Sequence, residues 1–392
     1  MTVLPGSIRH RCAVPGCTGR PAACLLDPPA GLRPGDDLDL RGLTVPDAAL
    51  AALLDALTDA AGTPRVGRAR FDGAVLPPGA ALRGVRFEGD ASFDGARFTG
   101  AASFYGASFL GHVSFHRARF AGNASFHGAH FHRHAAFTET VFAGDVLFGD
   151  TRWHADAVFD SADVTGAAAF DAARFGRDVT LRAARFAGPV SFRHVEAGRH
   201  ARLDRARFRQ GLRLGPLTAR GSLVLTGLTA LGDLHVRATA PVVTAREAAV
   251  RGAGGFRLRD GALDLEGAAF GAPLTVCGEA AAVLSLRDVS APHVTLTGLD
   301  LTHCRFLGLS AAVALDGCAF ATARHRPAAR ARAVLAEDVG GAADPRLTGV
   351  YTRLAASAPG ALGRDLRHGA ARCRHRARPR RARLLRWLTL AL

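Results

Sequence analysis

The stretch FDGARFTGAASFYGASF, residues 93–109, decides the fold of this 392-residue chain. Its phenylalanines follow one another at steps of five, six and five residues, and the same alternation runs without a slip from Phe71 to Val236. Of the 31 positions on this walk, which we call stations, 19 are Phe, 1 is Trp, 6 are Leu, 2 are Val and 3 are Ala. An apolar period this long predicts a stacked-repeat solenoid.

The stations are expected to form the core. A small apolar residue stands two positions before most of them, as Ala91 does before Phe93 and Val113 before Phe115. Side chains two apart in an extended chain point the same way, so each step aims a small and a large side chain inward. Gly is common two positions after a station, where the chain must turn a corner. The expected core includes Phe93, Phe98, Phe104, Phe109, Phe115, Phe120, Phe126, Phe131, Phe137 and Phe142.

Paired small and large residues at this beat, with Gly at the corners, resemble the pentapeptide-repeat family. Residues 93–109 look like its Phe-rich subgroup with alternating steps, and CAVPGC (12–17) with LRPGDDLDLRG (32–42) resembles the leader of actinobacterial members. The resemblance implies an all-β solenoid, a right-handed, quadrilateral parallel β-helix with 22 residues in each coil. Residues 71–323 then make on the order of 11 coils. The family implies no common reaction, and its best-understood members are binding proteins.

Composition along the chain predicts five regions. Residues 44–61 indicate a helix that covers the open end of the first coil, with Thr44 as its N-cap and Pro46 in its first turn. After Val236 the beat blurs, and after residue 323 it is lost, where helical pieces are expected at 326–338 and about 346–357. The regions are a Cys-containing leader (1–43), a capping helix and linker (44–67), a regular solenoid (68–240), a degenerate solenoid (241–323) and an Arg-rich helical tail (324–392).

Charge, hydropathy and motifs indicate the cellular compartment and exclude some classes of activity. The net charge is +16, and residues 324–392 hold 16 Arg against 4 acids. No apolar run resembles a signal peptide or the ~20 residues of a membrane span, so we expect a cytoplasmic protein. The sequence has neither a Walker loop nor a nucleophilic Ser elbow, and we expect no enzyme and no organic cofactor.

Two clusters could hold a metal ion. Cys12, Cys17 and Cys24 supply three thiolates, with His10 or Asp27 as a fourth ligand, so a structural zinc and free cytosolic thiols both stay open. In a 22-residue coil His112 lies under His134 and His132 under His154, about 4.8 Å apart. Such pairs could share a metal, but these columns hold no thiol and few carboxylates, with Asp156 above His134, which favours a solvated face.

Arginine marks two candidate interaction regions. Residues 174–220 hold 12 Arg against 3 acids, whereas residues 71–171 hold 7 Arg against 11 acids. The array is not acidic enough to mimic DNA, and with its aromatic rings turned inward it has no base-stacking platform, so nucleic acid is not the favoured partner. The tail ends in a basic run followed by LLRWLTLAL, which suits an anionic membrane surface, a capping helix or a disordered tail. The candidate arginines are Arg182, Arg185, Arg193, Arg207, Arg209, Arg380, Arg381 and Arg383.

These patterns favour a non-catalytic scaffold that presents rigid outer faces to a protein partner, whose identity the sequence leaves open together with the oligomeric state. The alternative is a peripheral scaffold that docks on the inner face of the membrane through its Arg-rich tail. A third hypothesis, more distant, is a metal-binding enzyme at the His cluster.

Overall fold

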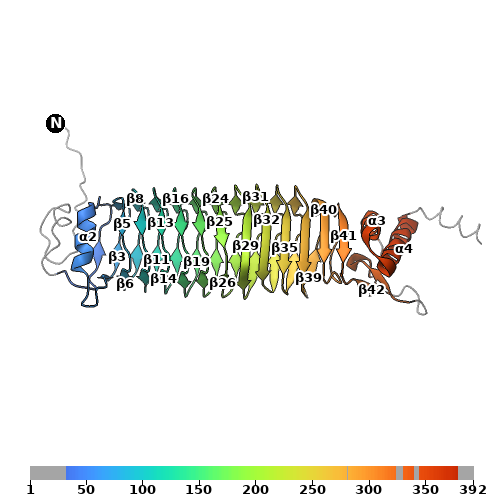
Figure 1. The fold of residues 1–392 in the computed structure, drawn as a ribbon, viewed down its shortest axis with the longest axis horizontal. Coiled ribbons are helices and arrows are strands. Elements are labelled where there is room, and N and C mark those ends of the chain that lie inside the picture. Colours follow the sequence, from blue (N-terminus) through green and yellow to red (C-terminus); the bar gives the residue numbers. More distant parts are fainter. Residues whose placement is uncertain (1–31, 280, 324–329, 340–343, 378–392) are drawn as a thin grey trace, which may run out of the picture. The chain divides into compact units, whose positions relative to one another are not determined.

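The computed structural model describes residues 32–279, 281–323, 330–339 and 344–377. It divides into two compact units, unit 1 up to Gly198 and unit 2 from Arg199, and each is described by itself. Both consist of turns of a parallel β-solenoid, about 11 in all (Figure 1). The sequence therefore predicted the fold class and the number of turns.

A turn of unit 1 has four short strands. β7 (Ala91–Ser92), β8 (Arg97–Phe98), β9 (Ala102–Ser103) and β10 (Ser108–Phe109) make one such turn. Each strand pairs in parallel with the strand 22 residues later, as Ala91 does with Val113 and Arg97 with Arg119. The four-sided turn of 22 residues expected from the period is therefore present in unit 1.

The strands of unit 1 stack in four rows, one for each side of the turn. Row A contains β1 (Leu38–Asp39), β3 (Ala69–Arg70), β7, β11 (Val113–Ser114), β15 (Ala135–Ala136), β19 (Ala157–Val158) and β23 (Val179–Thr180). Row B contains β4 (Val75–Leu76), β8, β12 (Arg119–Phe120), β16 (Val141–Phe142), β20 (Asp163–Val164) and β24 (Arg185–Phe186). Row C contains β5 (Ala80–Ala81), β9, β13 (Ala124–Ser125), β17 (Val146–Leu147), β21 (Ala168–Ala169) and β25 (Val190–Phe192). Row D contains β2 (Arg65–Val66), β6 (Arg86–Phe87), β10, β14 (His130–Phe131), β18 (Arg152–Trp153), β22 (Arg174–Phe175) and β26 (Val195–Ala197).

Stacked rings fill the interior of unit 1. Phe104, Phe126 and Phe148 form one column with ring centroids 4.8 and 4.9 Å apart. Phe126 also meets Phe115 and Phe137 edge-on, at 5.4 and 5.3 Å. Burial of each ring contributes about 1.5–3 kcal/mol, and each well-placed aromatic pair adds about 0.5–1.5 kcal/mol.

The corners of unit 1 are of two kinds. In the five-residue steps, the residue two after the station has a left-handed backbone, as at Gly95 (φ +64°) and Ala172 (φ +57°). In the six-residue steps the chain instead passes close to the turn before it. A β-carbon on Gly144 would lie 2.6 Å from the carbonyl carbon of Gly122. The first kind therefore accepts other residues, whereas a corner of the second kind has no room for a β-carbon where Gly144 stands.

A ladder of side-chain hydrogen bonds joins successive corners. The Asp145 N–H donates to Asn123 Oδ1 at 2.9 Å, and the Ala167 N–H donates to Asp145 Oδ1 at 2.8 Å. The same 22-residue link joins Asp90 to the His112 N–H. These carboxylates and amides satisfy backbone donors where no strand continues.

The helix α2 (Asp47–Ala56) covers the first turn of unit 1, beside β5 (Figure 1). It buries Leu50, Leu53 and Leu54. The expectation of a helix here was right, but the predicted cap was wrong. Pro46 precedes the helix without a side-chain cap, because Thr44 is drawn into a bridge with Val75.

Unit 2 keeps the solenoid but shortens most of its turns to 20 residues. Val236 pairs with Phe256, and Phe256 with Val276, at this spacing. Two sides of the turn join into one longer strand, so a turn has three strands. The apparent loss of the beat after Val236 is thus a change in turn length, which an 11-residue template cannot follow.

The strands of unit 2 form three rows. Row E contains β27 (Ala201–Arg202), β30 (Ser222–Val224), β33 (Val242–Thr244), β36 (Ala262–Asp264) and β39 (Ala282–Ser285). Row F contains β28 (Arg207–Phe208), β31 (Thr229–Ala230), β34 (Ala249–Val250) and β37 (Ala269–Phe270). Row G contains β29 (Leu212–Ala219), β32 (Leu234–Thr239), β35 (Gly254–Leu258), β38 (Leu274–Gly278), β40 (Ser290–Thr297) and β41 (Ser310–Asp316).

Beyond β41, unit 2 ends in a mixed cap. β42 (Ala321–Ala323) pairs antiparallel with β43 (Arg332–Val334), and a 3-10 turn η1 (Ala336–Asp338) follows. A helix over 326–338 was therefore a wrong expectation for the described part of that range. The expected helix near 346–357 is α3 (Leu347–Ser357), and α4 (Gly360–Ala377) packs against it.

The helix α3 closes the last turn of unit 2. It packs against β41 (Figure 1), where Arg353 Nη2 donates to the Leu309 carbonyl at 2.6 Å and Ser357 Oγ donates to the Val313 carbonyl. These side chains satisfy acceptors that the next turn of a longer solenoid would have used.

Candidate functional site

The phenylalanine stations do not form a binding surface. All 31 stations are buried, with at most 3% of any side chain exposed. Recognition must therefore use the outward side chains of the rows and corners.

The outward strand positions of row C in unit 1 carry no charge, and we call this surface the flat face. Its strands stand at the usual parallel spacing of about 4.8 Å. A shallow hollow of about 280 Å³ lies over β9, β13 and β17, and Leu147 at its border is 44% exposed. The outward residues of the flat face are Ala81, Ser103, Ser125, Leu147, Ala169 and Ser191.

A column of larger side chains runs along one corner of the flat face. Arg83 lies over the Tyr105 ring, 5.3 Å from its centroid, and the Tyr105 ring stacks on His127 at 5.6 Å. His127 Nε2 lies 3.6 Å from an Asp150 carboxylate oxygen. Tyr105 is 48% exposed, so the face has an aromatic side chain at its rim.

The predicted histidine stacking is present on another side of unit 1. The His132 and His154 rings stack at 4.7 Å, and His130 lies 6.5 Å from His132. Burial and the neighbouring cations Arg152 and His154 lower the pKa of His130. Burial, followed by His154, His130 and Arg86, lowers the pKa of His132.

His112 and His134 lie in adjacent turns, where Ala91 N–H donates to the His112 carbonyl and Val113 N–H to the His134 carbonyl. Both border a groove of about 670 Å³ on row A. Across the described ranges no three His, Cys, Asp or Glu side chains are placed to hold one metal ion. Cys12, Cys17 and Cys24 lie outside the described residues.

The candidate arginines are not gathered into one patch. Arg182 follows row A, Arg185 lies on row B and Arg193 follows row C, and all three are exposed. Rows A and C are opposite sides of a four-sided turn, so the basic excess of this segment is spread around unit 1. In unit 2, Arg207 on β28 and the nearby Arg209 are exposed. Arg380, Arg381 and Arg383 lie outside the described residues.

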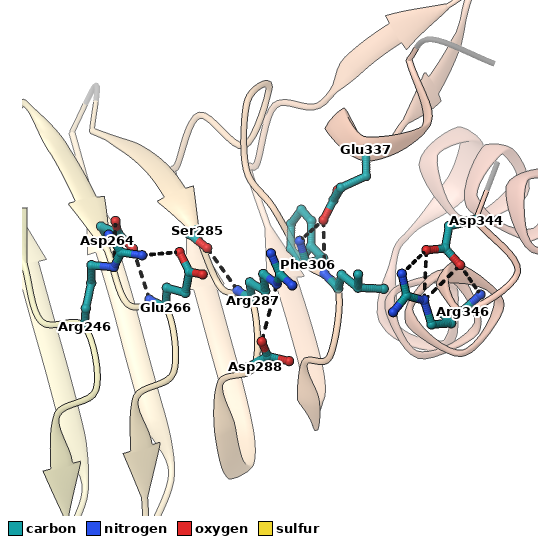
Figure 2. A network of polar contacts seen from close by, with 11 residues as sticks. Arg246, Asp264, Glu266, Ser285, Arg287, Asp288, Phe306, Glu337, Asp344 and Arg346 are labelled. Atoms are coloured by element: carbon teal, nitrogen blue, oxygen red, sulfur yellow. Dashed lines mark hydrogen bonds and ion pairs between the residues drawn. The ribbon is translucent and has the colours of Figure 1, made fainter. Parts of the chain in front are cut away.

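Most acids of unit 2 near its C-terminal end serve the fold (Figure 2). Arg246 pairs with Glu266 at 2.8 Å and Arg287 with Asp288 at 3.4 Å. Glu337 Oε1 accepts hydrogen bonds from the N–H groups of Phe306 and Leu307, which lie at the end of the last turns.

Asp338 of the C-terminal cap is fully buried. Its carboxylate accepts a hydrogen bond from the Tyr351 hydroxyl at 2.7 Å and pairs with Arg372. Burial raises the pKa of Tyr351 and lowers the pKa of Arg372. The cluster holds α3 and α4 to η1, and it is enclosed within the cap, so we assign it a structural role.

Sequence reasoning missed one further cluster, which consists of Arg237, Arg257 and Cys277 on row G of unit 2. Their 20-residue spacing was the signal that could have found them. Elsewhere, burial raises the pKa of Cys304 and Cys318, which makes these thiols poor nucleophiles. None of the helices within the described ranges is both long and apolar enough to cross a bilayer.

Comparison with known proteins agrees with the geometry. Residues 93–141 and 170–215 match the family model for pentapeptide repeats, in nine copies. No curated protein and no solved structure matches the chain. The matched repeats, the buried stations and the four-sided turns of unit 1 together support a pentapeptide-repeat protein.

Proposed function

We propose that this protein is a non-catalytic, cytoplasmic scaffold that binds a protein partner through the flat face of unit 1. The observation that carries the proposal is the contrast between this face and its surroundings. Six outward positions in a row are small or apolar and uncharged; Leu147 is exposed among them, and Tyr105 is exposed beside them. Protein interfaces are depleted in charge at their centre and enriched in aromatic side chains.

The surface also favours recognition over catalysis. The corner carboxylates of unit 1 accept backbone hydrogen bonds, and the described acids of the unit 2 cap hold backbone N–H groups or arginines. A regular, rigid surface loses little conformational freedom when a partner binds.

Affinity capture from a native lysate, with the full-length chain as bait, tests the assignment. Leu147→Glu places a charge in the centre of the flat face, and Leu231→Glu makes the same change at a leucine of unit 2 that is 48% exposed. We expect the wild type and Leu231→Glu to capture the same protein and Leu147→Glu to lose it. Equal capture by all three baits would exclude the flat face.

The second candidate function is docking on an anionic membrane through the Arg-rich tail. Arg374 and Arg376 are exposed in the last turn of α4, and the sequence beyond residue 377 continues with further arginines. Clustered arginines near a bilayer each contribute on the order of 1 kcal/mol to binding.

Liposome flotation compares the full-length chain with a variant that ends at residue 377. This end point keeps Arg372 paired with Asp338, so the cap stays intact. We expect vesicles with anionic lipid to float only the full-length chain, and equal flotation of both chains would exclude tail docking.

A further inference from the structure

Unit 2 carries an arginine cluster that its own acids do not neutralise. Arg237 and Arg257 are cross-strand partners on β32 and β35, and the next positions in this column are Cys277 and Thr297. Arg259 follows β35 at the adjacent bend. Like charges directly opposite one another on a sheet repel, so a bound anion would stabilise this pair.

Some other arginines of unit 2 have internal partners. Arg246 and Arg287, also in unit 2, pair with carboxylates at 2.8 and 3.4 Å. Arg237 and Arg259 pair with no acid of the described residues. Among the described residues, Glu279 is the only carboxylate in the wall around them. Contact with the Cys277 sulfur, followed by the charge of Glu279, raises the pKa of Arg257.

The arginines lie in a groove of about 460 Å³ that is entirely within unit 2. The register shift between Leu214 and Leu217 lies at one end of this surface, where Pro216 and Leu217 form a wall. Thr239 and Thr297 add hydroxyl groups to the lining. The volume lies within the range of small-ligand sites, which is about 300–1,000 Å³.

We propose that this groove binds a phosphorylated small molecule, with Arg237, Arg257 and Arg259 holding its phosphoryl groups. The guanidinium fork matches phosphate oxygens in two-point contacts, and threonine hydroxyls serve as further donors. The groove lining contains no aromatic side chain, so the site recognises phosphoryl groups and not a nucleobase. This site is independent of the flat face, which belongs to unit 1.

The test uses the full-length chain and pyrophosphate as the probe. Binding is measured by isothermal titration calorimetry at constant ionic strength, with inorganic phosphate and sulfate as comparison anions. The groove variant is Arg237→Gln/Arg257→Gln. The matched control is Arg207→Gln/Arg251→Gln, which removes the same charge from exposed arginines of unit 2 outside the groove.

We expect pyrophosphate to bind the wild type and the control alike, and the groove variant to bind about tenfold more weakly or less. Sulfate should bind more weakly than pyrophosphate. Equal losses in the two double variants would show diffuse charge attraction and overturn the proposal, as would no binding to the wild type at millimolar pyrophosphate.

Cys277 gives a second readout that does not depend on the variant. It is partly exposed in the groove wall, so bound pyrophosphate should slow its alkylation by iodoacetamide, measured by peptide mass spectrometry. The partly exposed Cys318 lies outside the groove and should react at an unchanged rate. Protection of neither thiol, or of both equally, counts against a site at this groove.

Discussion

Units 1 and 2 solve the same packing problem with turns of different length. A turn of unit 1 has 22 residues and four strands, and one such turn encloses Phe93, Phe98, Phe104 and Phe109. A turn of unit 2 between Val250 and Phe270 has 20 residues, three strands, and Phe256 as the only ring between these positions. Two extra residues at the corners widen the interior, so turn length and side-chain size must change together.

The ring columns should make unit 1 the more sensitive to truncation. Phe126 stacks between Phe104 and Phe148 and meets two further rings edge-on, whereas Phe256 has one edge-on ring contact, with Phe270 at 6.3 Å. Phe126→Ala should cost about 5 kcal/mol and Phe256→Ala about 3 kcal/mol, the two ends of the usual range. Denaturant unfolding measures both, and an unchanged transition for Phe126→Ala would refute its place in the core.

Replacing a buried leucine with the larger phenylalanine should destabilise unit 2 more than unit 1, the reverse of the order expected for truncation. Leu181, a station of unit 1, and Leu286 in unit 2 are both buried, and the turn that contains Leu181 also contains the rings of Phe175 and Phe186. Leu181→Phe should change stability by less than about 1.5 kcal/mol, because the wider turn accepts a ring. Leu286→Phe should cost about 1–3 kcal/mol through overpacking.

Thermal unfolding of both variants gives the comparison directly, and Leu→Met at the same two positions controls for the loss of branching. Equal costs for the two phenylalanine substitutions would break the link between turn length and side-chain size.

The sequence predicted the fold of unit 1 almost completely because one physical rule governs it. Every station must be apolar and its spacing must return to the same face after each turn. In unit 2 the rule survives with a different length: Val236, Phe256 and Val276 are evenly spaced, but the residues between them no longer follow the alternation. The merging of two sides into β32 or β35 depends on backbone choices at the corners, which the apolar pattern does not record.

The surfaces were less predictable than the core. Arg185 is exposed and the His132 ring stacks on His154, yet neither observation says which charges are neutralised. The link from Asp145 to the Ala167 N–H and the pairing of Arg246 with Glu266 require the register between turns. The groove around Arg237 and Arg257 became visible only once their 20-residue register was known.

The two corner types of unit 1 should respond differently to one methyl group. Gly144→Ala would place a β-carbon 2.6 Å from backbone atoms of the preceding turn and should cost about 1–3 kcal/mol. Gly95→Ala meets open space, so only the left-handed backbone opposes it, at a cost of about 1 kcal/mol. Ala183 already occupies the corresponding corner of a later turn. Chemical denaturation of both variants measures the difference, and a larger cost at Gly95 would contradict the assignment of the two corners.

The smallest expected effect is the pH dependence that the histidine stack gives to unit 1. In the folded protein the pKa of His132 is lowered by burial first and then by His154, His130 and Arg86. In an unfolded chain a histidine has a pKa of about 6.5. Below that pH the unfolded chain binds more protons than the folded protein. The free energy of unfolding therefore decreases as the pH falls, until the pH has passed the folded pKa, and it is then constant.

Unit 2 offers one described counterpart, His368, whose pKa is lowered by burial and Arg332 and raised by Asp365. Thermal midpoints between pH 8 and pH 5 should therefore fall less steeply in His130→Gln/His132→Gln than in the wild type. The change in slope should be larger than for His368→Gln, because the histidines of unit 1 also repel each other when protonated. If the double variant keeps the wild-type slope, the stacked imidazoles are not a source of acid sensitivity.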